Sequence, residues 1–149
     1  MELLSTLKKY RLLGFYFTLS PVEKEMLVRY SRHISFYIPP CLEVPPCEDL
    51  IFTVKSPAQL LWTTAANAIP DRKWDFAEKL LQKALAVADN CEDQAWIHAN
   101  LTQLYHDQHK KKPEYIKKCL YHCHQLLGTG YFTSWAENML AEVLVMHIH

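Results

Sequence analysis

Apolar side chains recur at spacings of three and four residues along most of this chain. That spacing places them on one face of an α-helix, whereas a half-buried strand would alternate every second residue. The pattern is strongest between residues 73 and 127, where three helical stretches follow one another with short turns between them. The sequence therefore predicts an all-α fold. Seven stretches show the pattern: residues 2–17, 21–35, 58–68, 73–88, 94–108, 113–127 and a last one from about residue 135.

Local signals agree with several of these boundaries. Ser20, Ser56 and Ser134 each stand at the expected start of a helix, where a serine hydroxyl can accept a hydrogen bond from a free backbone N–H. Glu23 follows Ser20 by three residues and completes a capping box. Gly128 is expected to end its helix, because glycine commonly follows the last helical residue.

The chain is expected to fold as a single domain, residues 1–149, with three parts. Residues 1–37 are predicted to form an N-terminal helical hairpin. Residues 38–55 are predicted to be an extended connector, since four prolines fall between residues 38 and 47 and proline disrupts helices and central strands. Residues 56–149 are predicted to form a helical-repeat body.

Charge and composition narrow the classes of function. Sixteen basic and sixteen acidic residues leave no net charge with histidine neutral, which argues against nucleic acid or an anionic membrane as the main target. No apolar run reaches the ~18 residues of a transmembrane helix. The cluster Lys110–Lys112 is interpreted as a solvated loop, with a phosphate-binding patch as the alternative. Five cysteines, an odd number spread along the chain, favour a reduced, cytoplasmic protein without a disulfide framework.

The same composition argues against common enzyme classes. Only three glycines occur, and no glycine-rich turn is present that could hold a nucleotide phosphate. No local pattern marks a catalytic nucleophile with its base. An enzyme is therefore the weaker hypothesis, no catalytic residue is assigned, and no cofactor is expected.

The helical body matches itself imperfectly at a shift of 39 residues, which places residues 74–81 over residues 113–120. Repeats near this length indicate stacked helix pairs. Over residues 58–89, small residues stand where two helices would cross closely, and a large residue stands where it would fill the gap to the next pair. With Ala65, Ala77, Leu81 and Ala84 at these positions, the pair resembles a tetratricopeptide repeat, and the resemblance extends over residues 56–149.

The resemblance implies a short right-handed array of antiparallel helix pairs whose first helices line a concave groove for a peptide or a partner's helix. An asparagine in this groove contacts the bound peptide in some members, but the lysines of a terminal-carboxylate clamp are missing from this sequence. A more aromatic groove is therefore expected, and the alternative is that the tryptophans belong to the core. The candidate groove residues are Thr63, Asn67, Trp96, Asn100, Gln103, Trp135 and Asn138.

A second hypothesis is a small-ligand or metal-binding helical protein. Cys119 and Cys123 lie four residues apart, and so on one helix face, and His122 is close enough to join them. Zinc requires about four such ligands. Cysteine also packs as a small apolar residue between helices, which is the competing interpretation.

The leading hypothesis is a scaffold or adaptor module that binds a protein or peptide partner. The last helix is unusually apolar for the end of a repeat array, which normally carries a polar outer face. A homodimer through this C-terminal helix is therefore a further expectation. Its apolar residues are Met139, Leu140, Val143, Leu144, Val145 and Met146.

Overall fold

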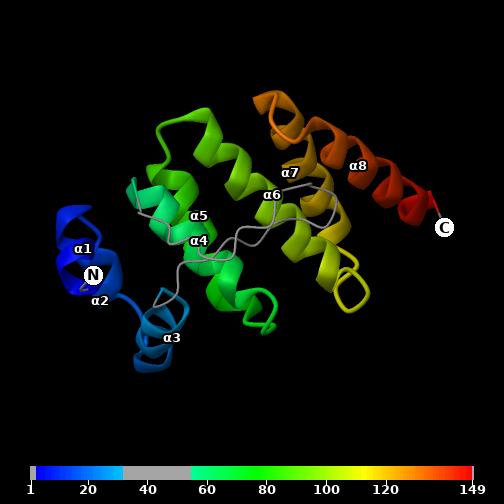
Figure 1. Cartoon of the computed structure of the whole chain (residues 1–149). Helices are drawn as coiled ribbons and strands as arrows, with labels where there is room; N and C mark the ends of the chain where they lie inside the picture. Colours follow the sequence, from blue (N-terminus) through cyan, green and yellow to red (C-terminus); the bar gives the residue numbers. More distant parts are fainter. Residues whose placement is uncertain (1–2, 32–54, 149) are drawn as a thin grey trace, which may run out of the picture. The chain divides into compact units, whose positions relative to one another are not determined.

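The computed structural model describes residues 3–31 and 55–148, and within these ranges every regular element is an α-helix (Figure 1). The prediction of an all-α fold is thereby confirmed. The proline-rich connector, apart from Lys55, lies outside the described residues. The helices are α1 (Leu3–Lys9), α2 (Leu13–Phe17), α3 (Pro21–Ser31), α4 (Pro57–Ala68), α5 (Trp74–Val87), α6 (Cys91–Gln108), α7 (Tyr115–Thr129) and α8 (Thr133–Ile148).

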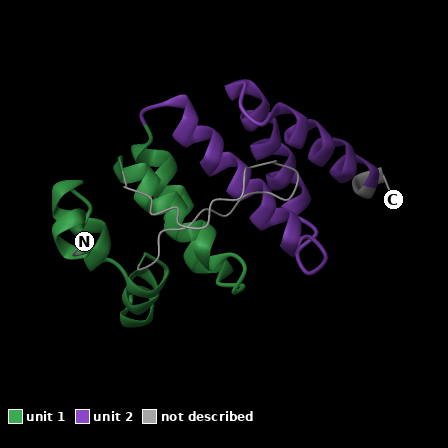
Figure 2. Cartoon of the chain, in the orientation of Figure 1, with its two compact units in different colours: residues 1–37, 47–88 green, residues 38–46, 89–149 purple. Residues whose placement is uncertain are grey.

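The chain divides into two compact units (Figure 2). Unit 1 comprises residues 1–37 and 47–88 and contains α1 to α5. Unit 2 comprises residues 38–46 and 89–149 and contains α6 to α8. In unit 1, α4 packs against α5 and α3; in unit 2, α7 packs against both α6 and α8. No helix in the described part of the chain is long and apolar enough to cross a membrane.

Unit 1 is built around the pair α4 and α5. Ala65, Ala77 and Ala84, the small residues expected at a close helix crossing, are completely buried together with Leu81. Polar contacts then attach α3 to this pair. The Tyr30 hydroxyl donates a hydrogen bond to Asp71 Oδ2 at 2.7 Å on the turn that follows α4.

Two of the three predicted serine caps are present. The Ser20 hydroxyl accepts the Glu23 N–H at 3.2 Å, and the Glu23 carboxylate accepts the Ser20 N–H at 2.9 Å, which completes the capping box. The Ser56 hydroxyl accepts the Gln59 N–H at 3.0 Å. The third prediction is wrong, because α8 begins at Thr133 and Ser134 already lies inside it.

Gly128 does not end its helix. It lies inside α7, and the terminating residue is Gly130, with φ of +78° in the left-handed region. Glycine adopts this region without the steric cost that a Cβ atom imposes. Both Gly128 and Gly130 are glycines that could end the helix. The helix continues to Gly130, so α7 extends two residues beyond the predicted stretch 113–127.

The N-terminal region also differs from its prediction. The single helix expected over residues 2–17 is divided into α1 and α2 by a turn at Arg11, whose φ is +60°. The turn lets both Leu7 and Leu12 be buried, although five residues of continuous helix would place them on different faces. In α3, Leu27 is buried, whereas Val22 is 63% exposed.

Unit 2 begins with a cap that the periodicity did not indicate. The Asn90 side chain accepts the Asp93 N–H at 2.8 Å, so α6 starts at Cys91 rather than near residue 94. Ile97, Leu101 and Leu104 are buried along α6. The longer helix carries three of the five candidate groove residues of this unit.

Candidate functional site

The seven candidate groove residues are divided between the two units. Thr63 and Asn67 lie on α4 in unit 1, and the other five lie on α6 and α8 in unit 2. Thr63 is buried, and Asn67 donates a hydrogen bond from its amide to the carbonyl oxygen of Tyr30 at 3.0 Å. Asn67 therefore helps to hold α3 on α4.

One face of α6 carries three of the candidates in a row. Trp96, Asn100 and Gln103 follow each other at spacings of four and three residues, which places them on the same side of the helix. Asn100 donates its amide to the Trp96 carbonyl at 2.8 Å, and Gln103 donates to Asp107 Oδ1 at 2.7 Å. The Asn100 Oδ1 atom is buried and has no hydrogen-bond partner among the described residues. This face thus presents a tryptophan beside the Gln103 amide.

Trp96 contacts the turn between α7 and α8. Its ring meets the Phe132 ring edge-on, with centroids 4.6 Å apart and planes at 64°. Tyr131, 42% exposed, stands beside Phe132 with ring centroids 6.3 Å apart. We call Trp96, Tyr131 and Phe132 the aromatic cluster. Trp96 and Phe132 are half-buried, and Tyr131 is exposed.

The backbone of Phe132 is strained. Its φ is +56°, a left-handed conformation that a bulky side chain rarely adopts. Such a conformation costs ~1–3 kcal/mol and persists only where the surrounding structure enforces it. Here the Phe132 carbonyl accepts the Ala136 N–H at 2.9 Å, in the first turn of α8. The start of α8 therefore fixes the direction of the Phe132 side chain.

The two remaining groove candidates differ from each other. Trp135 is only 4% exposed and belongs to the core of the described chain, as the alternative interpretation of the tryptophans held. Asn138 is exposed on α8. Further along α8, Leu144 and Val145 are also exposed. The homodimer through this helix stays a prediction.

The cysteines of the metal hypothesis point to separate places. The Cys119 thiol lies 3.5 Å from the Thr102 carbonyl on α6, and the Cys123 thiol lies 3.1 Å from the Ala136 carbonyl on α8. Burial raises the pKa of Cys119 to about 12 and that of Cys123 to about 11. Both thiols are therefore protonated at neutral pH, whereas nucleophilic attack requires the thiolate. Among the described residues, no three His, Cys, Asp or Glu side chains are grouped to hold a metal ion.

His122 instead pairs with His98 between α7 and α6. The two Nδ1 atoms are 3.0 Å apart, and the His122 ring stacks on Tyr105 with centroids 5.6 Å apart. Burial, His98 and Lys118 lower the pKa of His122 to about 4, and burial also lowers the pKa of His98. Both rings are thus neutral at pH 7, and one Nδ1–H donates to the other Nδ1. The cysteine spacing suggested a different partner for His122, and His98 lies 24 residues away in sequence.

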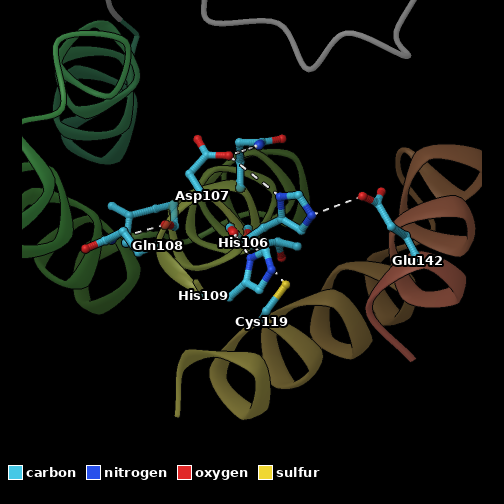
Figure 3. A network of polar contacts seen from close by, with 9 residues as sticks. His106, Asp107, Gln108, His109, Cys119 and Glu142 are labelled. Atoms are coloured by element: carbon cyan, nitrogen blue, oxygen red, sulfur yellow. Dashed lines mark hydrogen bonds and ion pairs between the residues drawn. The ribbon is translucent and has the colours of Figure 1, made fainter. Parts of the chain in front are cut away.

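A second histidine network joins α6 to α8 (Figure 3). His106 Nε2 lies 3.2 Å from Glu142 Oε1, and His106 Nδ1 lies 3.7 Å from Asp107 Oδ1. Asp107 and Glu142 raise the pKa of His106 because they stabilise the imidazolium more than burial disfavours it. His106 and Glu142 are 36 residues apart, so their pairing depends on the packing of three helices.

Searches against protein-family models, curated proteins and solved structures returned no match to this chain. A functional proposal therefore rests on the side chains of the described residues.

Proposed function

We propose that this protein is a helical module that binds a segment of another protein, with the aromatic cluster of unit 2 as its anchor site. The observation that carries the proposal is the contact of half-buried Trp96 with a strained Phe132 beside exposed Tyr131. Tryptophan and tyrosine are enriched among the few residues that supply most binding energy at protein interfaces.

The geometry of the cluster supports this role energetically. Each aromatic side chain can bury ~150–250 Å² of surface against a partner. The backbone of Phe132 holds its ring in place before binding, so less conformational entropy is lost on association. A ring that is already positioned gives more net affinity than a mobile ring of the same size.

An amide group beside the cluster supports recognition of a polypeptide. Gln103 is half-buried on the same face of α6 as Trp96. Its amide carries a donor and an acceptor, which suit the C=O and N–H groups of a peptide backbone. Asn100 is only 1% exposed, so its amide lies beneath this face and does not contact a bound peptide.

The test compares affinity capture by the wild-type protein with capture by a Trp96→Ala, Phe132→Ala variant, quantified by mass spectrometry. We expect partners of the wild type to be depleted with the variant, since loss of a hot-spot residue costs ~2 kcal/mol or more, about 30-fold in affinity. Phe17→Ala is the matched control, because Phe17 is a 67% exposed aromatic residue of unit 1. Equal recovery of the same proteins by all three would refute the anchor site.

The alternative function, a metal-binding helical protein that uses Cys119, His122 and Cys123, has less support. The two thiols face different helices, and His122 is paired with His98. A zinc titration of the purified protein tests it. One tightly bound equivalent that is lost in Cys119→Ala would favour the metal function over the scaffold function.

A further inference from the structure

The positive charge of unit 2 is concentrated in one short stretch. From residue 89 to the end the chain contains five lysines and no arginine, and all five lysines lie between residues 110 and 118. Glu114 is the only acidic residue in that interval. Five lysines and one glutamate give this segment a local excess of four positive charges. The rest of the chain balances this excess, because the chain as a whole has no net charge.

The lysines lie on the turn before α7 and on the first half of α7, which also carries an exposed tyrosine. Lys117, Lys118 and Tyr121 are exposed and lie on the same side of α7, at spacings of three and four residues. Tyr121 is 57% exposed. The turn before α7 adds three exposed lysines at the start of the same helix. We call this surface the lysine strip; it consists of Lys110, Lys111, Lys112, Lys117, Lys118 and Tyr121.

Tyr115 holds two of the lysines in place. The Nζ atoms of Lys112 and Lys118 lie 5.1 and 5.0 Å from the centroid of its ring. Lys112 Nζ also donates a hydrogen bond to the Tyr115 hydroxyl at 3.3 Å, and Lys118 Nζ lies 5.4 Å from the Tyr105 centroid. Because both ammonium groups contact one ring, they lie within about 10 Å of each other.

Two like charges at this separation repel each other, and an anion between them would be attracted by both. Lys110, Lys111, Lys117 and Lys118 form no ion pair with any carboxylate of the described residues. These four lysines are therefore not neutralised by acids of the described residues. Part of the entropy that long lysine side chains lose on binding is already lost through the contacts with Tyr115.

We propose that the lysine strip is a second docking surface, for a protein segment rich in aspartate and glutamate. Charge complementarity selects an anionic partner. The zero net charge of the whole chain argues against nucleic acid or an anionic membrane and leaves an acidic protein segment as the partner. Tyr121 supplies an aromatic contact for apolar residues among the acids. The strip and the aromatic cluster use different residues, so either proposal can fail while the other holds.

Fluorescence anisotropy on the full chain tests the proposal. The probe is a labelled twelve-residue peptide of alternating Glu and Asp with two leucines, and a peptide with Gln and Asn in place of the acids is its control. We expect wild type to bind the acidic peptide with an affinity that falls as salt rises. Lys117→Gln, Lys118→Gln should weaken binding roughly tenfold, as expected for two exposed charge pairs.

The matched control is Lys55→Gln, Lys73→Gln, which removes two exposed lysines of unit 1. It should change the affinity by less than about twofold, since neither residue belongs to the strip. An equal loss in both double variants would show attraction to net charge alone and would overturn the proposal. So would absence of binding, or tighter binding of oligouridine RNA or phosphatidylserine vesicles than of the acidic peptide.

A further variant tests the role of Tyr115. Tyr115→Phe keeps the ring that both ammonium groups contact and should retain the affinity. Tyr115→Leu removes the ring and should weaken binding although every lysine is still present. Circular dichroism checks that both variants fold. Equal affinities for the two would show that Tyr115 does not organise the strip, and binding would then have to be carried by charge alone.

Discussion

The two main helix pairs are packed by different chemistry. Between α4 and α5 in unit 1, the buried residues are aliphatic, aromatic, small or threonine, and none of them titrates near neutral pH. The buried residues of α6 and α7 in unit 2 include two histidines and two cysteines, together with Asn100, Thr102 and Gln108. The first interior is apolar apart from its threonines. The second places polar groups beneath the surfaces that we propose as binding sites.

The two interiors differ in how strongly their stability depends on pH. An apolar helix interface depends on shape and buried area, so pH changes it little. A polar interface is stable only while each group keeps its partner and its protonation state. The His98–His122 contact gives unit 2 such a dependence, and the charge of Lys118 also disfavours protonation of His122.

The largest expected effect is a cavity in the apolar interface. Leu81→Ala in α5 should lower the free energy of unfolding by about 2–5 kcal/mol, because Leu81 is completely buried. The cost should be the same at pH 5 and pH 7, since the buried residues of α4 and α5 do not titrate in this range. Urea denaturation measures both values. Gln82→Ala, at an exposed position of the same helix, is the control and should change stability little.

Acid should destabilise the polar interface. The pKa of His122 is about 4 in the folded chain and near 6.5 when exposed, so the unfolded state binds the proton more readily. The contribution of neutral His122 to the free energy of unfolding is therefore complete above pH 6.5. It falls as the pH drops toward 4, by roughly 3 kcal/mol. Denaturation at several pH values measures this loss, and His122→Phe should remove most of it. A wild-type stability that does not change over this interval would contradict the neutral histidine pair.

The helices were predictable because their signals are local. Periodicity identifies a helix within a few turns, and the caps at Ser20 and Ser56 use partners three residues away. A predicted helix end was wrong where two nearby residues could each end the helix, as with Gly128 and Gly130 at the end of α7. The turn at Arg11 was missed because the burial of Leu12 depends on packing with the rest of unit 1.

The candidate site was predictable only in part, because several of its contacts join residues that are far apart in the sequence. Trp96 and Asn100 follow from the helical pattern of α6, but the contact of Trp96 with Phe132 requires the turn after α7 to return to α6. The aromatic pair after Gly130 was a usable signal for this turn. The lysine strip required the lysines before α7 to be combined with those five to eight residues later. The His106–Glu142 contact has no local signal, because three helices must pack before the two residues meet.

The smallest expected effect has the opposite pH dependence to that of His122. The pKa of His106 is raised by Asp107 and Glu142, so its stabilising contribution is complete below pH 6.5 and is lost as pH rises through the folded pKa. Glu142→Gln should therefore cost most near pH 6 and almost nothing near pH 9. The cost should not exceed about 1 kcal/mol, because the Glu142 side chain is 57% exposed and water screens the pair.

Glu137→Gln is the matched control for this prediction, since Glu137 is an exposed acid of the same helix. Thermal denaturation of both variants at pH 6 and pH 9 separates the specific contact from a general charge effect. A specific contact lowers the midpoint only for Glu142→Gln and only at pH 6. Equal shifts for the two variants would mean that His106 responds to the negative charge of α8 as a whole. The pair His98–His122 would then be the specific titrating contact among the described residues of unit 2.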